Sequence, residues 1–189
     1  MFFIYIKKLY IFLIFILILI SFVLIYPSKR IFNSFNFMTE NDEKIHSTFD
    51  VYKDLYTTSY NMFLEKKFFG QGLQTFKKKC NNKKYISGRF GCSSHPHNYY
   101  FQVLSENGIV GFIIFCSLIL FLLKDAFFLF IKWIRSQADI NNLALVILSI
   151  NILLSFIPFF PTGNFYSSVT GIFLFFKISI FYGLKNHFK

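Results

Sequence analysis

The sequence predicts an all-α integral membrane protein with about four transmembrane helices and one large, mostly helical segment outside the bilayer. Of the 189 residues, 54% are hydrophobic and only 15% are charged, whereas a soluble domain carries about 25% charged residues. The apolar residues are gathered into long runs, which is typical of membrane spans. We therefore divide the chain into an N-terminal transmembrane helix (1–26), a large external segment (27–107) and a C-terminal membrane region with three transmembrane helices (108–189).

The first predicted span is residues 9–26, an apolar run of about 18 residues that can cross the hydrocarbon core at 1.5 Å per residue. A cleaved signal peptide is the alternative, but no small-residue cleavage motif follows the run, which favours an uncleaved helix. The other predicted spans are residues 108–123, 143–160 and 169–184. Residues 126–134 are apolar with interspersed basic residues, so we expect them to emerge through the interface or to lie in it.

The basic residues beside the spans predict the orientation of the chain. Those that fall on one side of the bilayer are Lys7, Lys8, Lys124, Lys132, Arg135, Lys185 and Lys189. The turn on the other side, residues 162–168, has no lysine or arginine. The positive-inside rule therefore places both termini in the cytoplasm and residues 27–107 outside. The net charge of +11 then suits membrane lipids and anionic lipid-linked substrates, and we expect no nucleic-acid partner.

The external segment contains one clear amphipathic helix, predicted to start at Ser47 and to end near Lys66. Its residues on one stripe at helical spacing are Tyr52, Leu55, Tyr56, Ser59, Tyr60, Phe63 and Leu64. Ser47 and Asp50 resemble a capping box at its start. The following Gly70-Gln71-Gly72 predicts a tight turn that needs positive φ angles.

A second polar motif, His95-Pro96-His97-Asn98, lies near the end of the external segment. Pro96 suits the first turn of a helix capped by Ser94 or His95, so we expect His97 and Asn98 in the opening turn. Unpaired backbone N–H groups at such a helix start favour an anion such as a phosphate. The helix is expected to run through Glu106 and to break at Asn107-Gly108, where the chain enters the second span.

The residues alone leave three interpretations of this cluster open. The histidines could be structural, they could serve as a general base for a lipid-linked substrate, or they could bind zinc with Cys80 and Cys92. The spacing of the four potential ligands does not match a standard zinc finger. Outside the cytoplasm a disulfide between Cys80 and Cys92 is the better prediction, and we expect no metal.

Two ordered motifs resemble the O-antigen ligase and polymerase family. They are Gly70-Gln71-Gly72 followed by Phe76, and the run from His95 through Asn98, Gln102, Glu106 and Gly108 to Gly111. In that family a G-x-G-x-x-x-F element precedes an H-x-H-N-x-x-L-Q-x-L-x-E-x-G-x-x-G element at the end of a large periplasmic loop. The resemblance covers nearly the whole chain and is concentrated in residues 69–112.

The resemblance implies a multi-pass protein of the bacterial inner membrane that performs metal-independent, inverting glycosyl transfer in the periplasm without a cofactor. The donor would be a glycan on undecaprenyl diphosphate. The acceptor would be lipid A-core in a ligase, or a growing glycan in a polymerase, and the motifs do not separate the two. Both kinds of substrate, together with membrane lipids, are the expected partners.

The same resemblance assigns roles to individual residues. His97 corresponds to the base that deprotonates the acceptor hydroxyl, with His95 as its supporting partner and Asn98 as a substrate contact. A histidine suits this role because its ordinary pKa near 6.5 leaves it largely neutral at pH 7. Family arginines hold the diphosphate, and Lys77 stands where relatives often have one. The candidate phosphate contacts are Lys77, Lys78, Arg89 and Arg30.

Family members have many more spans than this sequence. We therefore expect the chain to correspond to a C-terminal portion of the family. The alternative function is a catalytically incomplete membrane subunit or remnant, which would bind a polypeptide that supplies the remaining transmembrane helices.

Overall fold

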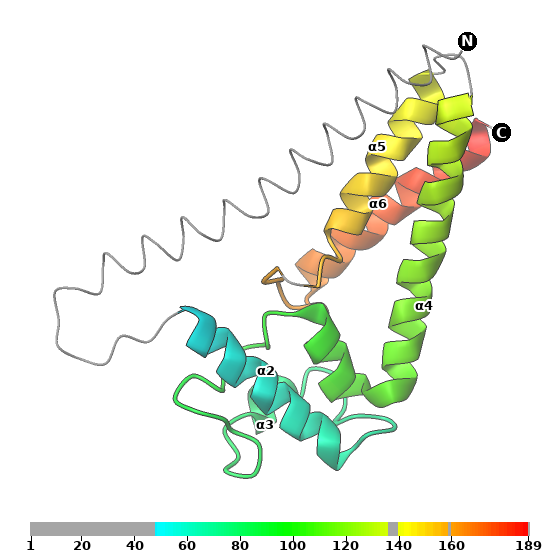
Figure 1. Ribbon diagram of the computed structural model, residues 1–189. Helices are drawn as coiled ribbons and strands as arrows, with labels where there is room; N and C mark the ends of the chain where they lie inside the picture. Colours follow the sequence, from blue (N-terminus) through cyan, green and yellow to red (C-terminus); the bar gives the residue numbers. More distant parts are fainter. Residues whose placement is uncertain (1–47, 136–139, 159, 189) are drawn as a thin grey trace, which may run out of the picture.

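The computed structural model describes residues 48–135, 140–158 and 160–188. Within these ranges the chain is all-helical and has no strand, as predicted. The helices are α2 (Thr48–Glu65), α3 (Phe76–Lys79), α4 (Tyr99–Arg135), α5 (Ile140–Leu154) and α6 (Ser168–His187), labelled in Figure 1. The first predicted span, the capping residue Ser47 and the candidate phosphate contact Arg30 lie outside the described residues.

Helix α4 consists of two limbs that meet at Gly108. This residue has φ 67° and ψ −165°, which is not helical, and the chain reverses direction there (Figure 1). A Cβ atom at Gly108 would lie 2.4 Å from the carbonyl oxygen of Phe68, so glycine is needed for both the φ angle and the close approach. The predicted helix break at Asn107-Gly108 is therefore confirmed. We call residues 99–107 the first limb and residues 109–135 the second limb.

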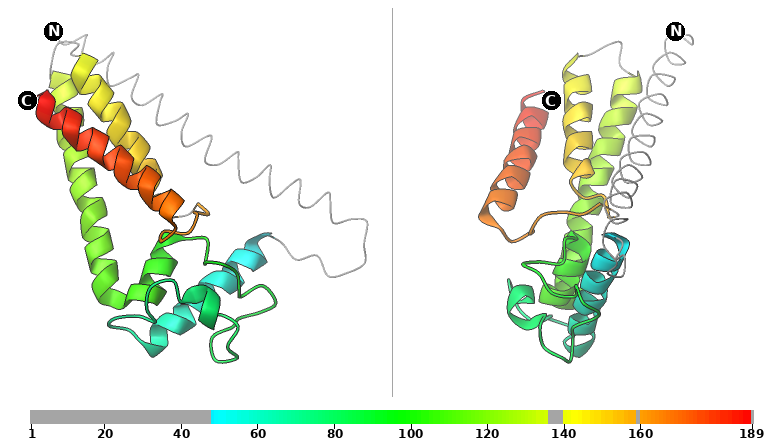
Figure 2. Two further views of the ribbon diagram at one scale, coloured as in Figure 1. Left: turned by 180° about the vertical axis from the view of Figure 1, so that it is seen from behind. Right: turned by 90° about the vertical axis from the view of Figure 1, so that its left-hand side faces the viewer.

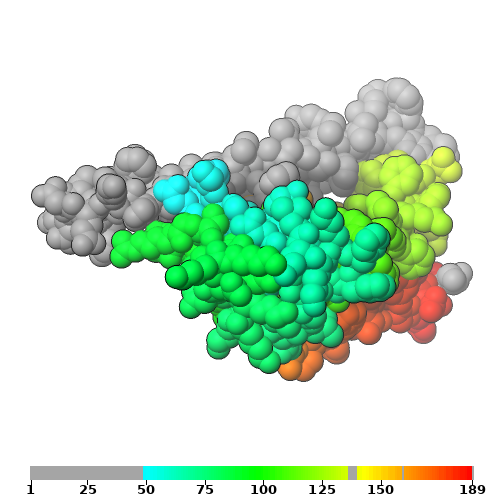
Figure 3. Space-filling view, turned by 90° about the horizontal axis from the view of Figure 1, so that it is seen from below, coloured from blue at the N-terminus to red at the C-terminus, as the bar shows by residue number. Residues whose placement is uncertain are grey.

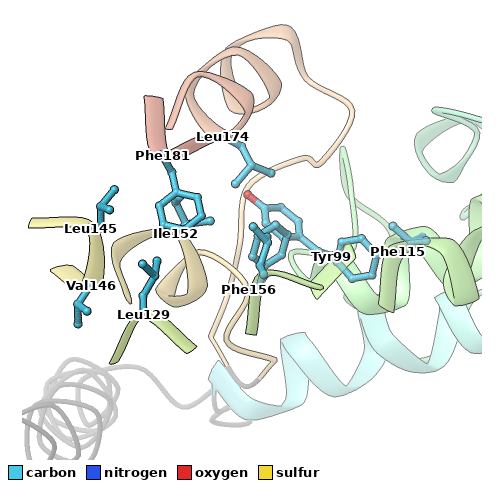
Figure 4. Close-up of a cluster of buried hydrophobic side chains, with 11 residues drawn as sticks. Tyr99, Phe115, Leu129, Leu145, Val146, Ile152, Phe156, Leu174 and Phe181 are labelled. Carbon is cyan, nitrogen blue, oxygen red and sulfur yellow. The ribbon is translucent and has the colours of Figure 1, made fainter. Parts of the chain in front are cut away.

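The second limb, α5 and α6 form a helical bundle. Figure 2 shows α5 between α4 and α6, and α5 packs against both. The buried side chains come from all three helices, including Leu129 of α4, Ile152 of α5 and Phe181 of α6 (Figure 4). An ion pair also joins α4 to α6, because Lys185 Nζ lies 2.6 Å from an oxygen of Asp125. Tyr182 donates a hydrogen bond of 2.8 Å to the same carboxylate.

In the described part of the chain, α4 and α6 are long and apolar enough to cross a membrane by length and composition. In the most apolar 18-residue stretch of each helix, only 22% (α4) and 11% (α6) is buried inside the protein. Large apolar side chains such as Ile114, Leu120 and Phe173 are therefore exposed. Such a surface is unusual for a helix in the core of a soluble protein and suits contact with lipid.

Residues 126–134 belong to α4, which continues without a break to Arg135, and their place at the membrane interface stays a prediction. One predicted helix boundary in the membrane region is wrong. The run 143–160 is helical only to Leu154, after which the chain passes through turns to Pro158. Pro158 lacks a backbone N–H donor and disfavours a helical conformation in the residue before it.

The remaining residues, 48–108, form a second unit that we call the loop unit. It contains α2, α3, the segment that leads to α4, and the first limb. In Figure 3, seen from below, residues of α2 and of this segment (cyan and green) form one continuous surface. Its small core consists of Leu55, Met62, Phe76, Cys80 and Tyr85.

Helix α2 has the predicted end but a different buried face. Its buried residues are Leu55, Thr58, Ser59 and Met62. Tyr60 and Leu64, which belong to the predicted stripe, are 46% and 43% exposed. The core of the loop unit packs on the side of Leu55 and Met62, and this tertiary contact decides which face of the helix is buried.

Candidate active site

The candidate site lies where α4 begins. Asn98 caps the helix, because its side-chain oxygen accepts hydrogen bonds from the backbone N–H groups of Tyr100 (3.0 Å) and Phe101 (3.3 Å). The prediction that Ser94 or His95 would be the cap is therefore wrong. His97 precedes the helix with a φ angle of 56°, in the left-handed region that few non-glycine residues adopt. The chain turns sharply there, so His97 is not in the opening turn.

The two predicted catalytic histidines are in contact. Their ring centroids lie 4.1 Å apart with the planes inclined by 48°. Thr162, in the connection between α5 and α6, holds both of them: its N–H donates to the carbonyl oxygen of His97 (2.8 Å), and its own carbonyl lies 3.3 Å from Nε2 of His95. The site therefore combines the loop unit with the bundle.

The hydrogen bonds of His95 assign its tautomer. A backbone carbonyl can only accept, so the contact with Thr162 requires a proton on Nε2 of His95. Its Nδ1 lies 2.8 Å from Oγ of Ser94 and accepts the hydroxyl proton. Both ring nitrogens of His95 are therefore engaged, and His95 is not positioned to act as a base.

His97 has a different arrangement. Ser93 donates its hydroxyl hydrogen to the carbonyl oxygen of His95 at 2.7 Å, so its oxygen can only accept from Nε2 of His97, which lies 3.4 Å away. The proton of the neutral ring is then on Nε2, and the lone pair is on Nδ1. This network leaves Nδ1 of His97 as the basic nitrogen of the pair.

Burial keeps both imidazoles neutral. Desolvation lowers the pKa of His97 below its ordinary value. Desolvation also lowers the pKa of His95, the neighbouring His97 lowers it further, and the carbonyl of Thr162 opposes this shift. At pH 7 the pair is thus uncharged and able to take up a proton.

Sequence reasoning missed the role of a polar stripe along the first limb. Asn98, Gln102 and Glu106 recur every four residues and are almost completely buried. Gln102 accepts from the N–H of Phe165 (2.9 Å) and donates to the side chain of Asn164 (2.7 Å). The four-residue spacing of polar residues was the signal that could have identified this buried face.

Glu106 and Asn98 bind two other segments. The carboxylate of Glu106 accepts hydrogen bonds from the N–H groups of Gln74 (3.0 Å) and Phe76 (2.8 Å). Burial nevertheless raises the pKa of this carboxyl. Asn98 donates to the carbonyl oxygen of Pro158 (2.6 Å) and is 2% exposed. The stripe therefore positions the glycine turn and both ends of the α5–α6 connection, and a substrate contact for Asn98 stays a prediction.

The glycine turn has the predicted conformation. Gly70 and Gly72 have φ angles of 67° and 104°. A Cβ atom at Gly70 would lie 2.4 Å from the backbone of Glu106, so the turn is pressed against the first limb. The N–H groups of Gln71 and Gly72 donate to the carbonyl oxygens of Ser105 and Glu106, both at 2.9 Å.

The predicted phosphate contacts are on the surface of the loop unit. Lys77 and Lys78 are exposed on α3, and the exposed guanidinium of Arg89 lies 5.8 Å from the ring centre of Phe90. Within the described ranges, no hydrogen bond, ion pair or ring contact joins these three side chains to the histidine pair. They are therefore not part of the histidine network.

The predicted disulfide between Cys80 and Cys92 is present, with a Cα–Cα distance of 5.0 Å. It links the end of α3 to the segment that leads to the histidines. Because the bond uses both sulfur atoms, the thiolates of the zinc interpretation are not available. In the part of the chain that the structure describes, no three His, Cys, Asp or Glu side chains form a metal-binding group.

An open cleft of about 570 Å³ is lined by residues of α2, of the start of α4 and of the α5–α6 connection, among them Asn98, which follows His97 in the chain. Its lining residues are Phe49, Tyr52, Lys53, Tyr56, Thr57, Asn98, Tyr100, Phe101, Pro158 and Pro161. The rings of Tyr56 and Phe101 are stacked at 4.6 Å, and Tyr52 meets His97 edge-on at 6.3 Å. Tyr52 thus belongs to both the cleft wall and the surroundings of His97.

Exposed apolar helices beside a half-buried, neutral histidine pair define a membrane-associated protein with a site suited to general-base chemistry. The chain belongs to the O-antigen ligase family, whose family model matches residues 1–116. This match includes the glycine turn and the histidine motif, and it supports a ligase-type or polymerase-type function. No curated protein and no solved structure matches the chain.

Proposed function

We propose that this chain is an O-antigen ligase-type glycosyltransferase of the bacterial inner membrane. It would move a glycan from an undecaprenyl-diphosphate donor to a lipid A-core acceptor in the periplasm. The observation that carries this proposal is the hydrogen-bond network in which His95 has both nitrogens engaged while Nδ1 of His97 keeps its lone pair.

In the proposed reaction, Nδ1 of His97 removes the proton from an acceptor hydroxyl group. The acceptor oxygen attacks the anomeric carbon of the donor sugar and forms the new glycosidic bond. The bond from that carbon to the diphosphate oxygen breaks, and undecaprenyl diphosphate leaves with the electron pair. Attack opposite to the leaving group inverts the anomeric configuration. The lowered pKa of His97 keeps it in the basic form at pH 7.

Charge develops on the departing diphosphate and requires cationic or N–H partners. Lys77, Lys78, Arg89 and Arg30 are the proposed contacts. Lysine binds phosphate as a point charge, whereas arginine can also form a bidentate pair. Lys77 and Lys78 lie on α3, and the Cys80–Cys92 disulfide links the end of α3 to the segment that carries the histidines. A diphosphate bound at α3 would therefore lie on a segment that is covalently linked to the histidine segment.

The proposed topology has α4, α5 and α6 crossing the membrane and the loop unit in the periplasm, because α5 has to return the chain to Thr162 beside His97. Helices α4 and α6 are the longer two of the three. Their exposed apolar surfaces support the crossing. The Cys80–Cys92 disulfide supports the location of the loop unit, because disulfides persist in the periplasm and are rare in the cytosol.

Complementation of a ligase-deficient strain with the full chain tests the proposal. The wild-type chain should restore polysaccharide on lipid A-core, visible as a ladder of lipopolysaccharide bands. His97→Ala should abolish the ladder. His187→Ala is the matched control, because His187 is exposed at the end of α6, and it should leave the ladder unchanged. An unchanged ladder in His97→Ala would refute the base assignment, and long glycan on the lipid carrier alone would favour a polymerase.

A further inference from the structure

The aromatic cleft beside His97 has no role in the proton transfer described above. We propose that it binds a pyranose ring of the acceptor glycan and so presents the acceptor hydroxyl to His97. This inference rests on the proposed function and adds the location and chemistry of the acceptor subsite. The cleft has a volume of about 570 Å³, which lies within the usual range of small-molecule clefts, about 300–1,000 Å³.

The composition of the cleft wall favours a sugar. Five of its ten lining residues are aromatic and two are prolines, and none is leucine, isoleucine, valine or methionine. The faces of aromatic rings are electron-rich, and the C–H groups on one side of a pyranose ring carry partial positive charge. A sugar ring can therefore stack on such a wall while its hydroxyl groups remain available for hydrogen bonds.

The polar groups at the cleft match these hydroxyl groups. Thr57 donates its hydroxyl hydrogen to the carbonyl of Lys53 (2.8 Å), so its oxygen can still accept from a sugar. Lys53 and Tyr52, whose side chains carry an ammonium and a hydroxyl donor, also line the cleft. Among the described residues, none that lines the cleft carries a carboxylate, and this lining suits a neutral or an anionic sugar. A polyprenyl chain has no hydroxyl groups and would leave these polar groups without partners.

The cleft is also held rigidly in place. The stacked pair Tyr56 and Phe101 joins α2 to the first limb at an interplanar angle of 7°. Asn98 fixes Pro158 on the opposite side through its 2.6 Å hydrogen bond. Tyr52 links the cleft to the base, because it lines the cleft and its ring centroid lies 6.3 Å from that of His97. A preformed wall reduces the entropy that binding must overcome.

Saturation-transfer NMR on the full chain in nanodiscs tests the occupant directly. The probes are glucose, galactose, N-acetylglucosamine and glucuronic acid, with farnesyl phosphate as the polyprenyl probe. At least one sugar should give signals with the wild-type chain, and Thr57→Trp, which fills the cleft, should reduce them at least about fivefold. Tyr60→Ala, an exposed position of α2 outside the cleft, is the matched control and should retain the signals. Signals from farnesyl phosphate alone, or sugar signals unaffected by Thr57→Trp, would overturn the proposal.

A transfer assay separates this inference from the proposed function. Tyr52→Ala removes one aromatic wall and should raise the KM for the acceptor about tenfold while the KM for the donor stays the same. If Thr57→Trp does not fold, the acceptor KM of Tyr52→Ala tests the subsite in its place. His97→Ala should lose transfer but keep sugar binding. If transfer occurs and Tyr52→Ala keeps the wild-type acceptor KM, the subsite is wrong while the function stands. If sugars bind and the wild-type chain transfers nothing, the proposed function is wrong instead.

Discussion

Glu106 accepts a 2.8 Å hydrogen bond from the backbone N–H of Phe76 and thereby joins two motifs that lie 30 residues apart. The N–H of Gln74 donates to the same carboxylate. Glu106 is 1% exposed and Phe76 is 0% exposed, so the N–H of Phe76 stays buried without a partner when the carboxylate is removed.

Glu106→Ala should therefore destabilise the loop unit by about 2–4 kcal/mol, since each buried N–H left without a partner costs about 1–3 kcal/mol. Glu106→Gln keeps one of the two acceptor oxygens and should lose about half as much. The measurement is thermal unfolding of the purified chain in detergent. Equal melting temperatures for wild type and Glu106→Ala would contradict the assigned role.

Transfer activity should fall on the acid side with a midpoint below about 6.5, the ordinary histidine pKa. The sign follows from burial, which lowers the pKa of His97 and leaves it unprotonated until the pH is lower than usual. The measurement is kcat/KM as a function of pH.

The neighbouring histidine provides the control for this pH profile. His95→Ala removes a ring 4.1 Å from that of His97 and admits water. His97 is then less desolvated and its pKa rises, so the midpoint of the acid limb of kcat/KM should move to higher pH. A midpoint at or above 6.5 in wild type, or no movement in His95→Ala, would contradict a buried base at His97.

Gly108→Ala should be strongly destabilising, by more than about 2 kcal/mol, because alanine is strained at positive φ and its Cβ would collide with the carbonyl of Phe68. Gly171→Ala is a matched control in α6, where an added Cβ meets nothing within 4 Å. This control should be neutral or stabilising by up to about 1 kcal/mol. Chemical denaturation in detergent measures both variants, and similar effects would contradict the account of the bend.

Asp125 and Lys185 form an ion pair between two apolar helices, with 12% and 23% of their side chains exposed. Removing one partner leaves an unpaired charge, so Asp125→Ala should cost about 3 kcal/mol. The double variant Asp125→Ala with Lys185→Ala should be more stable than Asp125→Ala alone. A double-mutant cycle measures this coupling, and additive effects would show that the pair is not coupled.

The local features of this fold were predictable from sequence. The turn at Gly70 and Gly72 and the break at Gly108 depend on backbone freedom that only glycine supplies. The pairing of Cys80 with Cys92 was expected from the predicted position of this segment outside the cytoplasm. These predictions needed no knowledge of distant contacts.

The features that depend on tertiary contacts were not predictable. The buried face of α2 is decided by the packing of Met62 within the core of the loop unit. The helical spacing of apolar residues did not show that Met62 would be buried and Tyr60 exposed. The helix cap at Asn98 prevails over the preference of Pro96 for a first helical turn, because Asn98 also binds Pro158. The contact between Thr162 and the histidines joins residues more than 60 positions apart.

The reversal at Gly108 has a consequence for the length of glycan that the protein can handle. The first limb spans about 14 Å and carries the chain away from the α5–α6 connection to the bend, so His97, which precedes this limb, lies beside Thr162 and a limb's length from the bend. In the proposed reaction the donor is anchored by its lipid, and only the sugar next to that anchor has to reach His97. The remaining sugars can extend into the surrounding fluid. We therefore expect a site that is indifferent to how many repeat units the polysaccharide contains.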